Sequence, residues 1–194
     1  MNSSIKVLDL GCGQNKIPGS VGIDFIQLPS VDIVHDLNVF PYPIADSSFD
    51  KVFLRNIIEH VTGIMKTMEE VHRISKPDAL VEILTPHYSS YTSWTDPTHL
   101  WHLGSQSFDY FCLEQNMNYY SQARFHIEYS HIKLNSVYKW LGFEFLVNLQ
   151  NQHKGFNFIR KFWERYLCFI IRARFMTFHL RVIKSSTNKV LAYN

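Results

Sequence analysis

The stretch VLDLGCGQNKIPGSVGID, residues 7–24, decides the fold. An apolar segment runs into a turn framed by Gly11 and Gly13, and a second apolar segment ends at Asp24. Glycine lets the backbone of such a turn take positive φ and approach a ligand closely. Parallel strands normally need a dozen or more connecting residues, so residues 14–20 are too few for a full crossover helix. The stretch predicts two parallel strands joined by a shortened helix or none.

Strand and helix patterns alternate through the rest of the first half. Apolar runs predict strands at 5–10, 21–24, 32–35, 49–54 and 80–84. The segment GIMKTMEEVHRIS, residues 63–75, places Ile64, Met68, Val71 and Ile74 at helical spacing. The following KPDA, residues 76–79, is predicted to stop this helix in a surface turn, because proline disfavours a helical residue before it. This alternation is typical of an α/β fold with a mainly parallel sheet.

The second half of the chain has a different character. Residues 86–111 are rich in His, Tyr, Trp, Ser and Thr, and we expect a long loop with a short helix near 107–114. Long ordered loops in compact domains usually serve as lids or binding loops. RFHIEYSHIKL and RFMTFHLRVIK, residues 124–134 and 174–184, alternate like strands. We expect them to pair as an antiparallel edge, with a helical excursion at 156–173 between them.

Length and composition favour one domain. A chain of 194 residues with 46% apolar content buries one substantial core, so we predict a single domain over 1–194. Within it we expect a cofactor-binding core at 5–85, a lid and acceptor loop at 86–126, and a helical insertion at 140–173. Three cysteines show neither a disulfide framework nor metal-ligand spacing. The sequence shows no signal-like start and no span-length apolar run, so a cytoplasmic protein is expected.

A net charge of +2 hides a basic C-terminal segment. Residues 151–194 carry nine Lys and Arg against one acidic residue, Glu164. Such a segment suits an anionic partner such as phospholipid headgroups, an acidic glycan or nucleic acid. Its bulky apolar residues at 156–171, beside Arg160, Lys161, Arg165 and Arg172, predict peripheral contact with the inner membrane face. The alternative is an ordinary amphipathic helix and edge strand with solvated cations.

Acidic residues end three successive predicted strands around the glycine turn. A dinucleotide fingerprint would need a third glycine where Lys16 stands, so that motif fails. Asp9 precedes the turn, Asp24 is placed to accept the two hydroxyls of a ribose, and Asp36 is available to an adenine amino group. Three carboxylates without a phosphate-binding motif suit a nucleoside that carries positive charge. S-adenosylmethionine is such a ligand.

At these residues the chain resembles the class I S-adenosylmethionine-dependent methyltransferases, over about residues 5–85. LDLGCG, GID, HDL…FPYPIADSSFDKV and NIIEHV…MEEVHRISKP resemble successive motifs of that family. The resemblance implies a Rossmann-like sheet, S-adenosylmethionine as cofactor and a methyltransferase activity. It further implies a role for each of eight cofactor-binding residues: Asp9, Gly11, Cys12 and Gly13 at the methionine end, Asp24 at the ribose, Asp36 and the Leu37 backbone at the adenine, and Asn56 facing the sulfonium.

A narrower likeness lies downstream. QNKIPGSVGID and PHYSSYTSWTDPTHLWHLGSQSFDYF are similar to segments of a bacterial subgroup of small methyltransferases. Its members share a Lys-x-Pro-Gly turn and an Asp-Pro-Thr-His loop, and are often associated with surface polysaccharide biosynthesis. This likeness points in the direction of surface polysaccharide and defines no substrate.

The loop after the fifth predicted strand offers the candidate catalytic residues. Methyl transfer mainly requires a nucleophile held close and in line, but a sugar hydroxyl must also lose its proton to a base. We predict His99 as that base with Asp96 orienting it, and His87 as the second candidate. The alternative is a turn in which Asp96 caps backbone amides and His99 only packs. We predict no metal site, because no ligand pair here has the i, i+4 spacing of zinc motifs.

The leading hypothesis is therefore an O-methyltransferase for a sugar, glycan or other small hydroxylated acceptor. A protein that binds S-adenosylmethionine without methylating, and uses the basic segment as a docking surface, is the alternative. Nucleic-acid methylation is a weaker third reading, because the chain lacks an Asn-Pro-Pro-Tyr-type tetrad and an added nucleic-acid-binding domain.

Overall fold

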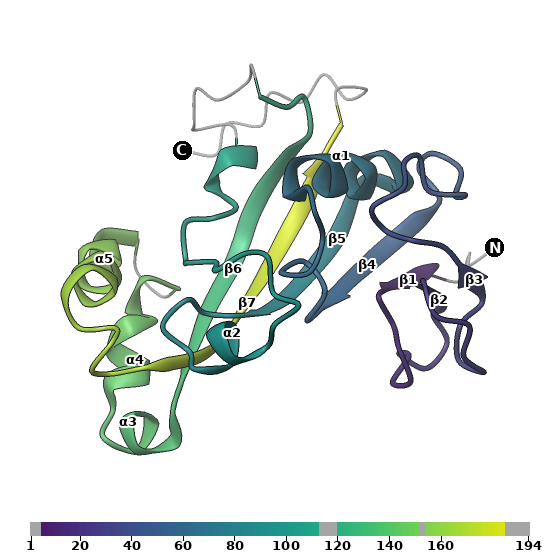
Figure 1. The fold of residues 1–194 in the computed structure, drawn as a ribbon. Coiled ribbons are helices and arrows are strands. Elements are labelled where there is room, and N and C mark those ends of the chain that lie inside the picture. Colours follow the sequence, from purple (N-terminus) through teal and green to yellow (C-terminus); the bar gives the residue numbers. More distant parts are fainter. Residues whose placement is uncertain (1–4, 113–119, 152–153, 185–194) are drawn as a thin grey trace.

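A computed structural model describes residues 5–112, 120–151 and 154–184. These residues form a seven-stranded sheet in the order β3-β2-β1-β4-β5-β7-β6 (Figure 1). The strands are β1 (Val7–Leu10), β2 (Val21–Asp24), β3 (Ile33–Val34), β4 (Phe49–Arg55), β5 (Ser75–Pro86), β6 (Arg124–Leu134) and β7 (Ala173–Ile183). The helices are α1 (Ile64–Ile74), α2 (Thr92–Thr95), α3 (Ser136–Trp140), α4 (Phe143–Val147) and α5 (Asn157–Tyr166), with single 3₁₀ turns at η1 (Asp109–Phe111), η2 (Leu149–Asn151) and η3 (Lys154–Phe156).

The sheet confirms the predicted fold class. Strands β1 to β5 are parallel where they pair, and β7 runs antiparallel to both β5 and β6. The pair β6–β7 forms the expected antiparallel edge, with its helices inserted between the two strands. Residues 11–20, all of which the structure describes, contain no helix. The chain instead returns through a compact turn that places Val21 beside Leu8 on the neighbouring strand.

One predicted boundary differs. The segment KPDA does not form a separate surface turn, because β5 begins at Ser75 directly after α1 and includes these residues. A register shift between Phe49 and Lys51 on β4 lets Ser75 and Leu80 both pair with that strand. Residues 76–79 lie between these two pairs and form the irregularity, in which Asp78 takes a positive φ of 65°. A bulge therefore replaces the expected turn.

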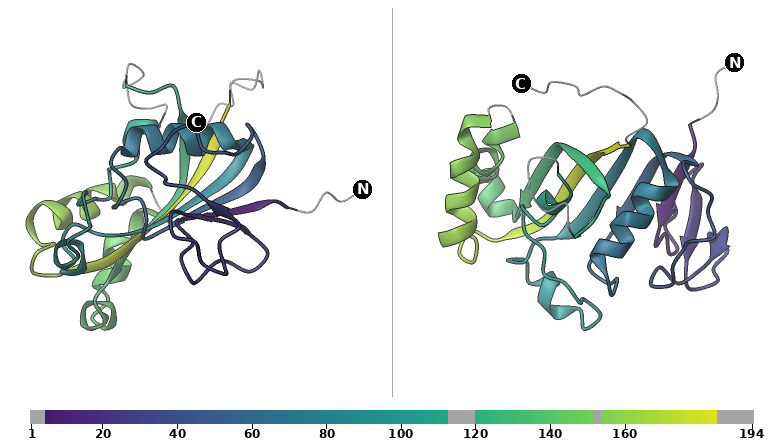
Figure 2. Two further views of the ribbon diagram at one scale, coloured as in Figure 1. Left: turned by 45° about the vertical axis from the view of Figure 1, so that its right-hand side comes forward. Right: turned by 90° about the horizontal axis from the view of Figure 1, so that it is seen from above.

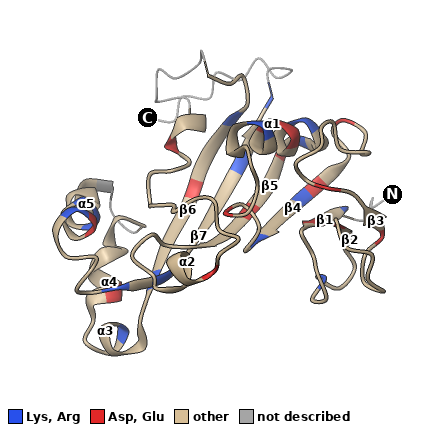
Figure 3. Ribbon diagram, viewed as in Figure 1, with Lys and Arg blue, Asp and Glu red and all other residues tan. Residues whose placement is uncertain are grey.

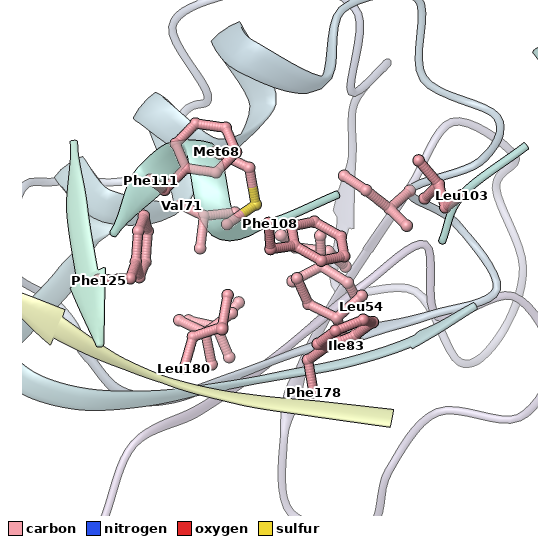
Figure 4. Close-up of a cluster of buried hydrophobic side chains, with 14 of the residues drawn as sticks. Leu54, Met68, Val71, Ile83, Leu103, Phe108, Phe111, Phe125, Phe178 and Leu180 are labelled. Carbon is pink, nitrogen blue, oxygen red and sulfur yellow. The ribbon is translucent and has the colours of Figure 1, made fainter. Parts of the chain in front are cut away.

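The main core lies between the sheet and α1. Met68 and Val71 of α1 face the sheet, as their helical spacing predicts, and are fully buried. Phe108 and Phe111, from the loop that follows β5, enter the same cluster beside Phe125 (Figure 4). The aromatic side chains of this loop therefore anchor it to the core. The expected short helix at 107–114 is only the 3₁₀ turn η1, and residues 113–119 lie outside the described part of the chain.

Helices α3 to α5 form an arm at the β6–β7 edge of the molecule (Figures 1 and 2). Arg160 of α5 holds this arm together. Its guanidinium, 2% exposed, donates to the carbonyl oxygens of Val147 and Ser130, to the Ser130 hydroxyl and to the Asn148 side-chain oxygen. Burial lowers the pKa of Arg160 to about 10. Arg160 therefore points into the protein and is not one of the surface cations that the sequence suggested.

Candidate active site

A cavity of 480 Å³ opens at the carboxyl ends of β1, β2 and β4. This is where open α/β sheets bind ligands, beside the point at which the strand order reverses, and the volume is typical of small-molecule sites, about 300–1,000 Å³. We call it the cofactor cavity. Its lining residues are Gly11, Asp24, Phe25, Asp36, Leu37, Asn38, Asn56, Ile57, His60, Val61 and Thr98.

Gly11 shapes the floor of the cofactor cavity. Its φ is +64°, and a Cβ atom at this position would lie 2.4 Å from Cγ1 of Ile57. Its amide donates to the carbonyl oxygen of Ile23 at 2.9 Å, which fixes the turn against β2. Any side chain at position 11 would therefore displace the Ile57 side chain, which itself lines the cavity.

Asp24 presents a preorganised carboxylate at the tip of β2. Oδ2 accepts the Gly13 amide at 2.9 Å and Oδ1 accepts the Ile26 amide at 3.1 Å. A carboxylate has about four acceptor positions, so each oxygen keeps one for a further donor. Backbone amides from two loops thus hold this acidic group in place at the cavity wall, where two neighbouring ribose hydroxyls would find acceptors.

Asp36 and Leu37 offer an acceptor and a donor side by side in the cavity lining. Oδ1 of Asp36 accepts the Asn38 amide at 2.9 Å and the Asn38 side-chain amide at 3.1 Å. The Leu37 amide donates no hydrogen bond within the described residues. A carboxylate beside a free amide complements the amino group and ring nitrogen at the edge of an adenine.

Three predicted cofactor residues lie behind the cavity instead of lining it. The Gly13 amide donates a hydrogen bond to Asp24, and the Cys12 side chain packs toward Gly22. Asp9 is fully buried, and its Oδ2 accepts the Ile17 amide at 2.9 Å and Arg55 Nη2 at 2.8 Å. Its Oδ1 is buried without a partner among the described residues. In this structure these three residues shape the turn, and the cavity wall at the tip of β1 is Gly11.

A second cavity of 540 Å³ shares Asn56 and His60 with the first. We call it the acceptor cavity. Asn56 follows β4 directly, takes a positive φ of 51° and donates its amide to the Leu84 carbonyl oxygen at 2.8 Å. Strained backbone of this kind is common at functional sites. The lining residues of the acceptor cavity are Asn56, Glu59, His60, Pro86, Thr92, Thr95, Asp96, Pro97, His99 and Phe175.

His99 lies in the acceptor cavity with an available ring nitrogen. Its Nδ1 is 3.1 Å from the Ser93 carbonyl oxygen, an acceptor that places the ring proton on Nδ1. Nε2 therefore carries the lone pair, 3.7 Å from Oδ2 of Asp96 and 4.0 Å from Oε1 of Glu59. With a side chain 6% exposed, the imidazole is held in a largely dry position.

Asp96 makes the turn contacts that the sequence left open as the alternative, and it also lies near His99. Its Oδ1 accepts the Thr98 amide at 2.9 Å and the Thr98 hydroxyl at 2.6 Å, which closes the DPTH turn. These bonds lower the pKa of Asp96, so the carboxylate is ionised at neutral pH. Its Oδ2 faces His99 beyond hydrogen-bond length, close enough to stabilise a charged imidazolium.

Glu59 and His60 also line the acceptor cavity, although the sequence did not single them out. Glu59 is 1% exposed, and its Oε2 accepts the Thr85 hydroxyl at 3.0 Å while Oε1 is buried without a partner in the described residues. Burial raises the pKa of this carboxyl. Nδ1 of His60 is 3.2 Å from the Thr98 carbonyl oxygen, and its ring meets the His99 ring edge-on at 4.6 Å. Ligand atoms of Glu59, His60 and His99 lie within 4.8 Å of one another, a set that could also hold a divalent cation.

A third hollow of 690 Å³ runs along the start of α1. It shares Asn38 with the cofactor cavity, but neither Asn56 nor His99 lines it. Its walls are mainly apolar, with Phe40, Met65 and Trp101 among them. Its position on the Asp36 side of the cofactor cavity, away from the catalytic candidates, makes it the weaker acceptor site.

His87 lies outside both cavities, contrary to its predicted role as a second base. The imidazole is fully buried and stacks on Tyr88 with ring centroids 4.3 Å apart. Its Nδ1 contacts the Ser89 hydroxyl at 2.8 Å, and its Nε2 lies 3.2 Å from Oε1 of Glu164 on α5. His87 therefore connects the loop after β5 with helix α5 of the arm.

Glu164 is the acidic partner in this contact between the loop and the arm. Its ionisation makes the stability of the fold depend on pH in the acidic range. Both carboxylate oxygens accept hydrogen bonds from Ser105, and His87 lies beside one of them. Burial alone would raise the pKa of Glu164, but the bonds from His87 and Ser105 outweigh it and lower the pKa below the ordinary 4.5. The ionised form thus stabilises the fold at neutral pH. This contribution is complete above the unfolded-state pKa and is lost as pH falls through the lower folded-state value.

We expect Glu164→Gln to remove this sensitivity. Wild type should melt at a higher temperature than Glu164→Gln at pH 7, and the difference should shrink as pH falls below about 4.5. Thermal melting of both proteins across this range, followed by circular dichroism, measures the effect. A gap between them that stays constant in acid would show that Glu164 is not held ionised by these contacts.

Known proteins share this architecture. The chain is similar in fold to YcgJ from Bacillus subtilis, with TM-score 0.55, 13% identity, and 93% of this chain and 92% of that one covered. It is also similar to S-adenosylmethionine-dependent methyltransferases from Archaeoglobus fulgidus (TM-score 0.54, 14% identity, coverage 91% and 86%) and Mesorhizobium loti (TM-score 0.53, 14% identity, coverage 91% and 90%). A search of curated proteins gave no match. The family described as methyltransferase domain matches residues 1–126. The chain therefore belongs to the methyltransferase domain family, and it is a class I enzyme that uses S-adenosylmethionine.

Proposed function

We propose that the enzyme methylates a hydroxyl group of a sugar, a glycan unit or another small hydroxylated acceptor. The observation that carries this proposal is the junction of the two cavities, where Asn56 and His60 line both and His99 lines the acceptor side. A hydroxyl held in the acceptor cavity would meet a basic ring nitrogen on one side and the cofactor on the other. The hydroxyls of Thr92 and Thr95 and the Asp96 carboxylate on its wall suit a polyhydroxylated ligand.

The cofactor cavity fits the adenosyl part of S-adenosylmethionine. Asp24 would accept the ribose hydroxyls, and Asp36 with the Leu37 amide would hold the adenine edge. Asn56 would lie near the sulfonium, as the resemblance implies. When bound, S-adenosylmethionine supplies an electrophilic methyl group, so the protein must bring the acceptor oxygen close and in line.

Removal of the hydroxyl proton is the second task, and we assign it to His99. Its Nδ1–H faces the Ser93 carbonyl oxygen, so Nε2 is free to accept a proton from the acceptor. The imidazolium that forms would gain from ionised Asp96, whose Oδ2 is 3.7 Å away. The His60 ring packs edge-on against the His99 imidazole and restricts its rotation.

Turnover on a panel of acceptors tests this function. Purified enzyme with S-adenosylmethionine should release S-adenosylhomocysteine when a sugar or glycan acceptor is present, and not with tRNA or duplex DNA. Binding of the cofactor without turnover on any acceptor would favour the alternative of a non-catalytic cofactor-binding protein. Turnover confined to nucleic acid, with the steep salt dependence of phosphate contacts, would contradict the proposal.

Metal removal separates proton transfer from metal-assisted chemistry. If His99 acts as a base, treatment with EDTA should leave turnover with the best acceptor within about twofold of the untreated rate. A loss restored by Mg²⁺ or Mn²⁺ would instead make Glu59, His60 and His99 ligands of a cation that acidifies the hydroxyl. Turnover with and without chelator, on enzyme stripped of metal, decides between the two.

A further inference from the structure

We propose that the outer face of the arm formed by α3 to α5 docks onto an anionic phospholipid surface. The face is defined by Trp140, Phe158, Phe162, Tyr166, Phe169 and Ile170, all exposed. Trp140 is 86% exposed and Ile170 is 69% exposed. Single exposed apolar residues are common on proteins, but a contiguous group of large ones marks an interaction site.

The side chains of α5 and of the residues just after it form a stripe. Phe158, Phe162 and Tyr166 follow one another at i, i+4 and i+8 along α5, and the rings of Phe162 and Tyr166 lie 5.1 Å apart. Phe169 and Ile170 extend the stripe past the end of the helix. The hydroxyl of Tyr138 donates to the Ile170 carbonyl oxygen at 2.6 Å, which places α3 beside this end; Trp140 is a further exposed aromatic residue of that helix.

Helix α5 is turned so that Arg160, Trp163 and Glu164 face inward and its other aromatic residues, Phe158, Phe162 and Tyr166, face outward. Arg160 and Trp163 are buried and bind backbone oxygens within the arm and its support. Glu164 is bound to Ser105 and His87. Because these contacts fix the inner face, the aromatic stripe cannot reach the protein core. A helix whose outer side faced only water would normally carry polar residues there, so the exposed aromatic residues indicate that this side contacts another surface.

The charges of the arm complement an anionic surface. Lys139, Lys161, Arg165 and Arg172 are exposed, and blue segments mark α3 and α5 in Figure 3. The two acidic residues of 136–172, Glu144 and Glu164, are turned inward, where Glu144 accepts the Leu134 amide at 2.9 Å. Each Lys or Arg near an anionic leaflet adds to the attraction. Aromatic residues interleaved with cations are the pattern of helices that lie in the lipid interface.

Charge also decides between a lipid surface and a second copy of this chain. A two-fold dimer through this face would bring the same cations of both copies together, because such an interface is self-complementary. Like charges at an interface oppose association, whereas phospholipid headgroups of negative charge attract them. Within the described ranges no helix has the length and apolar character that a membrane crossing requires. Docking would therefore be peripheral.

Vesicle co-sedimentation tests the proposal independently of catalysis. Wild type should sediment with phosphatidylcholine vesicles that contain phosphatidylglycerol, bind pure phosphatidylcholine more weakly, and be released by high salt. Phe162→Ser should weaken binding at least about tenfold, and Lys161→Glu should weaken it mainly at low salt. Matched controls are Ile5→Ser and Lys66→Glu, which change an exposed apolar residue and an exposed cation outside the arm.

Each remaining outcome overturns the docking proposal. Failure of the wild type to sediment with anionic vesicles at low salt would do so directly. Equal binding by Phe162→Ser and Ile5→Ser would place the contact elsewhere on the protein. A concentration-dependent dimer, lost in Phe162→Ser and insensitive to vesicles, would give the face to a second copy. Retained binding of S-adenosylmethionine by every variant shows that they fold, and turnover plays no part in the readout.

Discussion

Replacing His99 by alanine is expected to lower kcat by about 10²–10⁴-fold while S-adenosylmethionine affinity stays unchanged. The affinity should be kept because His99 lines the acceptor cavity and not the cofactor cavity. The rate should fall because Nε2 is the ring nitrogen free to take a proton from a bound hydroxyl. Steady-state kinetics with a saturating acceptor, beside a calorimetric titration of the cofactor, measure the two quantities separately.

His102→Ala is the matched control for this prediction. His102 belongs to the same loop, stacks on Trp94 at 3.6 Å and contacts the Ser93 hydroxyl, but lines neither cavity. Its loss should therefore change kcat far less. If both variants lost cofactor binding, or lost turnover equally, the histidine loop would be a structural element and His99 would not be the base.

The second large effect concerns Asp24. We expect Asp24→Asn to weaken S-adenosylmethionine binding by about 10- to 100-fold, because hydrogen bonds to charged groups contribute roughly 1.5–3 kcal/mol. Asparagine keeps the shape and one acceptor oxygen, so only one of the two backbone amides, that of Gly13 or that of Ile26, would keep its hydrogen bond. The measurement is isothermal titration of wild type and variant with S-adenosylmethionine.

Asp32→Asn provides a control of the same chemistry. Asp32 also accepts a backbone amide, from Gly22 at 2.7 Å, and pairs with Lys16 at 2.7 Å, but it lines no described cavity. Its replacement should lower stability and leave cofactor affinity near that of the wild type. Equal loss of affinity in both variants would mean that Asp24 acts only by holding the loops.

The sheet was predictable because its signals are local. The strand Val21–Asp24 is found where its sequence predicts, and α1 spans Ile64–Ile74 within the predicted 63–75. The short turn at 11–20 excludes a long helix by its length alone. In the same way, acidic residues at strand ends predict positions at one edge of a parallel sheet, and Asp24 and Asp36 do line one cavity there.

Residues whose roles depend on distant partners were not predictable. Arg160 appears in the sequence as one more surface cation, and only Ser130 and Asn148, from other elements, make it a buried anchor. His87 follows β5 at a favourable position, but a contact with Glu164, far along the chain, removes it from the cavities. Glu59 and His60 fall within NIIEHV, a segment to which the sequence assigned no site residue other than Asn56. Their only local signal was their place just after Asn56 at the tip of β4.

A crystal structure with S-adenosylhomocysteine tests the central claim most directly. We predict that both ribose hydroxyls lie within hydrogen-bond distance of the Asp24 carboxylate, with the adenine between Asp36 and Leu37 and the sulfur directed toward Asn56. The account would be contradicted if the ligand bound elsewhere, if Asp24 turned away from the ribose, or if side chains of the protein filled the cavity at Gly11.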